Sequence, residues 1–118
     1  MRFAFRRPRF PVIVVAGDRV FAAISPAALK TLLGRELRPG MDIKLLDLTW
    51  EWFELARDSD LLVPSFLDRA PPTKRTVLAL VNGRTNRPPG RPLYDPRSIS
   101  NHSRDAIFAE LVALLPRR

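Results

Sequence analysis

The sequence predicts a small α+β domain in which an antiparallel or mixed β-sheet packs with helices. Two observations carry this prediction. Apolar, β-branched segments flank the pair Gly17-Asp18 at the spacing of a β-hairpin, and other segments repeat alanine and leucine at helical spacing. With 118 residues and a hydrophobic fraction of 46%, the chain can build one core and is too short for two. We therefore expect residues 1–118 to form a single domain, with helices on one face of the sheet.

The N-terminal part of the chain predicts a hairpin followed by a helix. The hairpin is expected over residues 12–24, and glycine as the first turn residue favours a type II′ turn. Ser25 and Pro26 form a helix start, because serine can cap a helix and proline fits its first turn. Alanine and leucine then recur on one face as far as Gly34, which predicts a helix near residues 26–33.

The central part predicts a strand, a short helix and a buried strand. Apolar and polar residues alternate up to about Leu48, which indicates a strand. The aromatic residues that follow permit either continued strand alternation or a helix, and from the spacing of Trp50 and Phe53 we favour a helix near residues 50–57. Residues 76–81 leave little polar face, which is typical of a buried strand.

The C-terminal part predicts a loop and a last helix. Residues 84–100 contain four prolines and have no regular period, so we expect a long Pro/Arg-rich loop. Ser103 can cap a helix near residues 104–115, because the apolar stripe of this segment has helical spacing and ends before Pro116.

The formal net charge of +8 is concentrated in two segments without acidic residues. One is a basic N-terminal arm, residues 1–9, and the other spans residues 74–91. Codon usage in a GC-rich genome would explain seventeen arginines against three lysines, but it does not explain the missing acids. Arginine is well suited to phosphate, because its planar guanidinium donates two parallel hydrogen bonds. The residues expected to bind nucleic acid are Arg2, Arg6, Arg7, Arg9, Lys74, Arg75, Arg84, Arg87 and Arg91.

A cluster of aromatic residues has two interpretations. Trp50, Trp52 and Phe53 are either core residues or, if exposed, a surface for a protein partner. The neighbouring Glu51 and Glu54 would repel phosphate, which makes nucleic acid a poor ligand for this cluster. The alternative function is therefore a homo-oligomeric accessory or protein–protein interaction domain, with a homodimer or an acidic protein as the partner.

Enzymatic patterns are weak, so we expect no catalytic residue, no metal site and no cofactor. The chain has no cysteine, and its one histidine, His102, lies in a polar segment typical of a loop and helix cap, which disfavours both a zinc site and a Ser/His/Asp triad. Asp58 and Asp60 have the chemistry of magnesium ligands, but this spacing is more typical of a solvated helix end or a helix cap. A small hydrolase or nuclease is the least favoured function.

The sequence predicts a cytoplasmic protein without a membrane span. The apolar run over residues 10–16 ends at Gly17-Asp18-Arg19. Its length is too short for the core of a signal peptide or for a helix that spans a bilayer. The favoured function is a small non-enzymatic basic binding module that contacts nucleic-acid phosphates through its arm and loop.

Overall fold

A computed structural model describes the chain over residues 2–3, 7–36, 42–55, 61–64, 72–86 and 102–116. It confirms the predicted α+β class. The elements are β1 (Arg2–Phe3), β2 (Val12–Ala16), β3 (Arg19–Ala23), α1 (Pro26–Glu36), β4 (Ile43–Leu46), β5 (Trp52–Leu55), β6 (Leu61–Pro64), α2 (Lys74–Asn82) and α3 (Arg104–Leu114). Among these helices, none combines the length and the apolarity needed to cross a bilayer.

The strands form one mixed sheet in the order β1-β6-β5-β4-β2-β3. Every neighbouring pair is antiparallel except β1 and β6, which are parallel. The expected hairpin is present, with Ala16 opposite Arg19 across the two-residue turn. Gly17 has a φ of 63° and Asp18 does not have a positive φ, which is the sign pattern of a type II′ turn.

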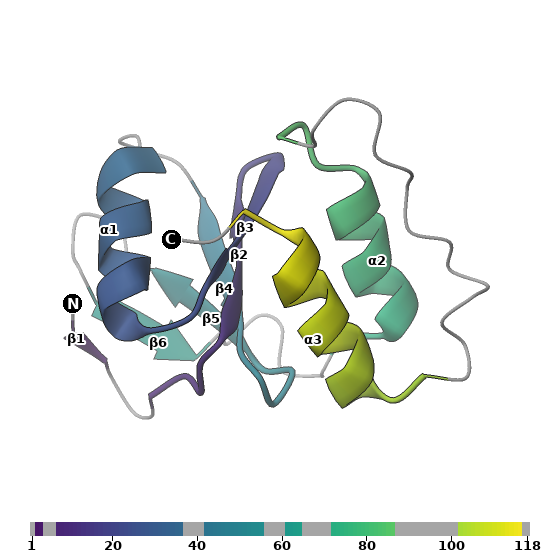
Figure 1. Cartoon of the computed structure of the whole chain (residues 1–118). Helices are drawn as coiled ribbons and strands as arrows, with labels where there is room; N and C mark the ends of the chain where they lie inside the picture. The colour runs from purple at the N-terminus through teal and green to yellow at the C-terminus, as the bar shows by residue number, and fades with distance from the viewer. Residues whose placement is uncertain are drawn as a thin grey trace.

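Helices cover both faces of the sheet, with α1 on one side and α2 and α3 on the other (Figure 1). The expectation of helices on one face is therefore wrong. Successive strand residues point to opposite faces, and consecutive residues of the central strands are buried, as in Ile13-Val14 and Leu45-Leu46. Ile13 and Leu46 belong to the core under α2 and α3, whereas Val14 and Leu45 belong to the core under α1. A sheet that is apolar on both faces requires cover on both.

The helix expected near residues 50–57 is wrong, because Trp50 and Glu51 belong to a turn and Trp52–Leu55 form β5. β5 pairs with β4 through Leu46 opposite Trp52 and Leu45 opposite Phe53. Trp52 and Phe53 are both buried, one in each core. The helical spacing was misleading because a strand with two buried faces has no alternating polar side to identify it.

The strand expected over residues 76–81 is also wrong, because this segment belongs to α2. Thr73 caps the helix, its Oγ1 accepting a hydrogen bond from the Thr76 backbone N–H at 3.2 Å. Val77, Leu78 and Val81 are buried while the residues between them are exposed, which is a helical pattern. Thr73 was the local indication of a helix start, but the apolar residues that follow it were interpreted as a buried strand.

The remaining expected helices are present. α1 continues past Gly34 to Glu36, and Ser25 caps it by accepting a hydrogen bond from the Ala28 N–H at 3.1 Å. Ser103 caps α3 in the same way, through the Ala106 N–H at 3.1 Å. Most of the Pro/Arg-rich loop expected over residues 84–100 lies outside the described residues.

A buried carboxylate organises the turn between β4 and β5. Asp47 is 2% exposed, and its Oδ1 accepts hydrogen bonds from the Thr49 N–H at 3.0 Å, the Thr49 hydroxyl at 2.7 Å and the Glu51 N–H at 3.0 Å. Its Oδ2 accepts from the Arg9 N–H at 3.1 Å. The Trp50 N–H donates to the Asp47 carbonyl at 2.9 Å, and Trp50 has a φ of 66°, the left-handed region that few bulky residues adopt.

We predict that Asp47→Asn lowers the free energy of unfolding by about 2–3 kcal/mol, because the amide group replaces one acceptor oxygen with a donor that faces other donors. Urea unfolding measures this loss. Asp18→Asn, at an exposed position of the hairpin turn, is the matched control and should change the stability by less than about 0.5 kcal/mol. Equal effects of the two substitutions would contradict the organising role of Asp47.

Candidate nucleic-acid interface

The outer face of α1 carries exposed cations. Leu29, Leu32 and Leu33 point into the core, which leaves Lys30 and Arg35 on the exposed side of the helix. Arg35 lies in the last turn, where a positive charge interacts favourably with the helix dipole.

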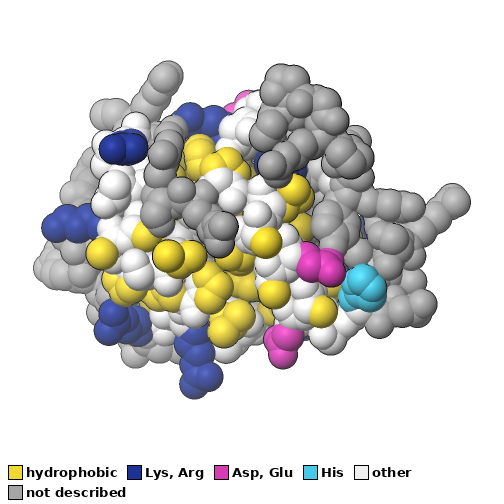
Figure 2. Space-filling view, in the orientation of Figure 1, with side chains coloured by type: hydrophobic (Ala, Val, Ile, Leu, Met, Phe, Trp, Pro, Cys, Tyr) yellow, Lys and Arg dark blue, Asp and Glu magenta, His cyan; other side chains and the backbone are white. Residues whose placement is uncertain are grey.

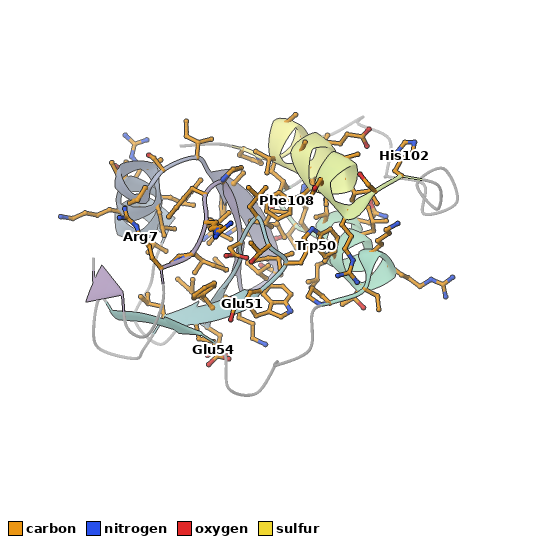
Figure 3. The ribbon with its side chains drawn as sticks, turned by 90° about the horizontal axis from the view of Figure 1, so that it is seen from below. Arg7, Trp50, Glu51, Glu54, His102 and Phe108 are labelled. Carbon is orange, nitrogen blue, oxygen red and sulfur yellow. The ribbon has the colours of Figure 1, made fainter. Side chains whose placement is uncertain are left out.

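The segment that leads into β2 adds two exposed arginines, Arg7 and Arg9. Phe10 packs against the core under α1, which places this segment on the α1 side of the sheet. In the view of Figure 3, Arg7 lies toward the α1 side of the molecule and away from His102. The Arg9 backbone is fixed by its bond to Asp47 and by the Leu48 N–H, which donates to the Arg9 carbonyl at 3.0 Å. The side chain of Arg9 thus extends from a rigid backbone.

We group four exposed cations of α1 and of the segment before β2 under the name α1 basic face, namely Arg7, Arg9, Lys30 and Arg35. Among the described side chains of residues 7–35 there is one acid, Asp18, in the hairpin turn at the opposite end of β2 from Arg7 and Arg9. In Figure 2, Lys and Arg side chains gather on the α1 side of the visible face, whereas most of the acidic side chains lie toward α3. On this visible face, the described cations therefore lie mostly apart from the described acids.

Two of the predicted cations lie on the other side of the sheet, in the first turn of α2. Arg75 is exposed, and Lys74 is half-buried with its Nζ donating a hydrogen bond to the His102 carbonyl at 2.6 Å. This contact joins the starts of α2 and α3, which run in the same direction (Figure 1). The surroundings are of mixed charge, since α3 carries Asp105 and Glu110, and His102 Nδ1 lies 3.9 Å from Glu110 Oε1.

Arg84 is buried, so its assignment as a surface residue that binds phosphate is wrong. It is 6% exposed, and its Nη1 donates to the Val81 carbonyl at 2.5 Å. The Arg84 guanidinium thus shares this carbonyl, in the last turn of α2, with the Arg84 backbone N–H, which donates to it at 3.4 Å. The side chains of four other predicted residues lie outside the described residues, namely Arg2, Arg6, Arg87 and Arg91.

The aromatic cluster is core, which is the first of its two interpretations, and it does not form an exposed surface for a partner. Trp50 is 2% exposed, Trp52 9% and Phe53 0%. The Trp50 ring packs against Phe108 of α3 with a centroid separation of 6.3 Å, and the guanidinium carbon of Arg104 lies 5.2 Å from the Trp50 ring centroid (Figure 3). These residues join the sheet to α3 instead of facing a partner.

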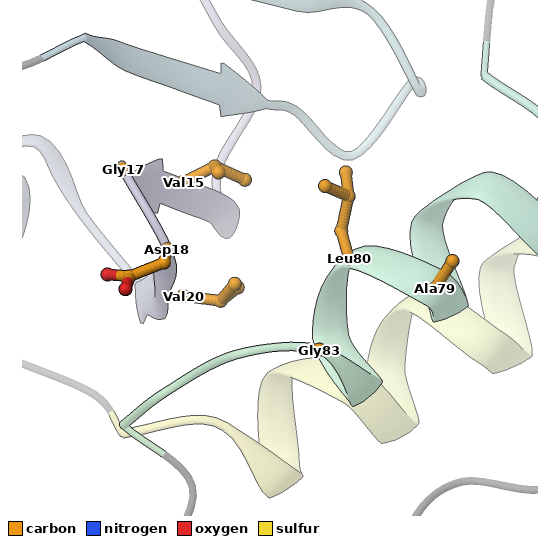
Figure 4. A pocket seen from close by; sticks show the side chains of 7 residues that line it. All are labelled: Val15, Gly17, Asp18, Val20, Ala79, Leu80 and Gly83. Carbon is orange, nitrogen blue, oxygen red and sulfur yellow. The ribbon is translucent and has the colours of Figure 1, made fainter.

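The described residues hold no cluster of metal ligands, and one of their pockets is apolar. No group of three potential ligands gathers among them, and Asp58 and Asp60 lie outside them. A shallow pocket of about 150 Å³ opens between the hairpin and α2, with Val15, Val20 and Leu80 among its lining residues. Figure 4 shows the Asp18 carboxylate turned away from Leu80, and the lining of the pocket is mainly apolar.

Comparisons of the chain with protein-family models, with curated proteins and with solved structures find no match. The two cations of α1 were absent from the residues predicted to bind phosphate. Their signal was present in the sequence, because Lys30 and Arg35 fall outside the leucine stripe of a helix that was itself predicted. Lone cations separated by five positions do not stand out as a charge run.

We predict that Gly34→Ala stabilises the protein by about 0.5–1 kcal/mol, because glycine costs backbone entropy in a helix and an added Cβ meets nothing within 4 Å. Thermal or urea unfolding measures the gain. Gly17→Ala is the matched control and should destabilise, since Gly17 has a φ of 63° that alanine disfavours. A loss of stability in Gly34→Ala would show that the exposed face of α1 does not have this geometry.

Proposed function

We propose that the protein is a non-enzymatic module that binds nucleic-acid phosphates through the α1 basic face. One observation carries the proposal. Four exposed cations project from two segments that pack on the same side of the sheet, and the described acidic side chain of residues 7–35 lies in the hairpin turn. Such a face attracts a polyanion, and binding releases the counterions condensed on it.

The chemistry of this face favours contacts with phosphates over the reading of bases. Lysine and arginine on a convex surface neutralise phosphates and carry no sequence information by themselves. The aromatic residues that could have stacked on bases, Trp50, Trp52 and Phe53, are buried. We therefore propose binding that is independent of sequence. A cytoplasmic location agrees with this function, and a chain without cysteine is compatible with reducing conditions.

We predict that short single-stranded and double-stranded oligonucleotides bind with an affinity that falls steeply as salt increases. Lys30→Ala combined with Arg35→Ala should reduce the slope of log affinity against log salt by about 1.4–1.8, because about 0.7–0.9 is lost for each phosphate contact. Fluorescence anisotropy titrations at several salt concentrations measure both the affinity and the slope.

The matched control is Lys74→Ala combined with Arg75→Ala, which removes the same charge from α2 on the other side of the sheet. This pair should leave the slope nearly unchanged. Equal losses in the two double variants would show that net charge, and not the α1 basic face, drives binding. An absence of binding at low salt would reject the proposed function, and a defined dimer mass in light scattering would then favour the homo-oligomeric alternative.

A further inference from the structure

The outer edge of β3 has the composition of a strand that pairs readily. β3 is an edge strand, and the stretch from Val20 to Ile24 contains no charge, no proline and no glycine. Ala16 and Arg19 flank a two-residue turn and are opposite each other. The backbone N–H and C=O groups of Arg19, and of every second residue after it, therefore form hydrogen bonds with β2. The backbone groups of Val20 and Ala22 point away from β2, toward the outer edge. An uncovered edge of this kind is a template for another strand.

Two segments close this edge without forming a strand. Beyond α2, the Asn86 side chain accepts a hydrogen bond from the Val20 N–H at 3.0 Å and donates to the Val20 carbonyl at 2.8 Å. Its amide thus supplies the donor and the acceptor that a neighbouring strand would supply. Next to it, the Thr85 N–H donates to the Asp18 carbonyl at 2.9 Å.

The second segment follows α3, where the Pro116 carbonyl accepts a hydrogen bond from the Ala22 N–H at 2.9 Å. Proline has no N–H to return, so a ladder of strand pairing cannot continue through this residue. Ile24, just beyond β3, remains 57% exposed, and Figure 2 shows hydrophobic side chains across the middle of the visible face. Among the described residues, contacts of Thr85, Asn86 and Pro116 therefore close the edge, and the strand segment that they cover is apolar.

We propose that the β3 edge is a latent interface for a second copy of this chain, and that the Asn86 side chain at Val20 and the Pro116 carbonyl at Ala22 keep it closed. Antiparallel pairing of β3 with its own copy is self-complementary about a twofold axis. Centred on Ala22, this pairing places Val20 opposite Ile24 of the other copy and Arg19 opposite Ser25. No like charges then face each other, and the outward backbone groups of both strands are satisfied. This inference is independent of the proposed phosphate binding.

The test replaces Asn86 by alanine and, separately, by serine, whose shorter side chain cannot reach both groups of Val20. Thr85→Ala is the matched control, because it retains the backbone bond from residue 85 to Asp18. Light scattering over a range of concentrations should give a monomer for the wild type and the control, and a concentration-dependent dimer for both Asn86 variants. Far-UV circular dichroism and a cooperative urea transition establish that each variant is folded.

The distance between two spin labels, one on each copy, identifies the direction and the register of the strand pairing. The chain has no cysteine, so Asp18→Cys provides a single exposed labelling site in the hairpin turn. Pairing centred on Ala22 separates the two labelled backbones by roughly 25–30 Å, because eight residues of strand lie between them, whereas parallel pairing would separate them by about 5 Å. Folded Asn86 variants that remain monomeric, or dimers with a different label separation, would overturn the proposal. The serine variant decides the question if the alanine variant does not fold.

Discussion

The buried carboxylate of Asp47 is the interaction on which the arrangement of the other elements depends. A carboxylate can be removed from water only when donors surround it, and here four hydrogen bonds reach its two oxygens. Three of them close the turn between β4 and β5. The fourth comes from the Arg9 backbone and fixes the point at which the chain enters β2. One side chain thus sets both the register of β5 against β4 and the start of the central hairpin.

The same turn connects the sheet to its helices on both faces. Trp50 adopts a left-handed backbone conformation that costs about 1–2 kcal/mol, and its burial against Phe108 under the guanidinium of Arg104 offsets this cost. On the opposite face, Phe10 follows Arg9 directly and packs into the core under α1. A loss of the Asp47 contacts would therefore loosen both helical layers together.

The elements predicted correctly are those with local signals. Gly17 specifies the hairpin turn, and Ser25 and Ser103 specify helix starts, because these residues act within a few positions. The errors concern burial, which depends on distant residues. Trp52 and Phe53 are buried in cores on opposite faces of the sheet, and Arg84 is buried at the end of α2, where its guanidinium meets the Val81 carbonyl. Similarly, Arg7 and Arg9 were found as a charge run, whereas Lys30 joins them only through the packing of α1.

The net charge has opposite effects on two kinds of association, namely the pairing of two copies of the chain and the binding of a polyanion. A net charge of +8 makes two copies repel each other, so it assists the Asn86 contact in keeping the β3 edge unpaired. The same charge attracts a polyanion to the α1 basic face. Added salt screens both effects, because the Debye length falls from about 10 Å at 0.1 M to about 3 Å at 1 M. Added salt should therefore weaken phosphate binding and strengthen the pairing of two opened β3 edges. An affinity that falls with salt thus indicates binding through charge, and an affinity that rises with salt indicates pairing through the backbone.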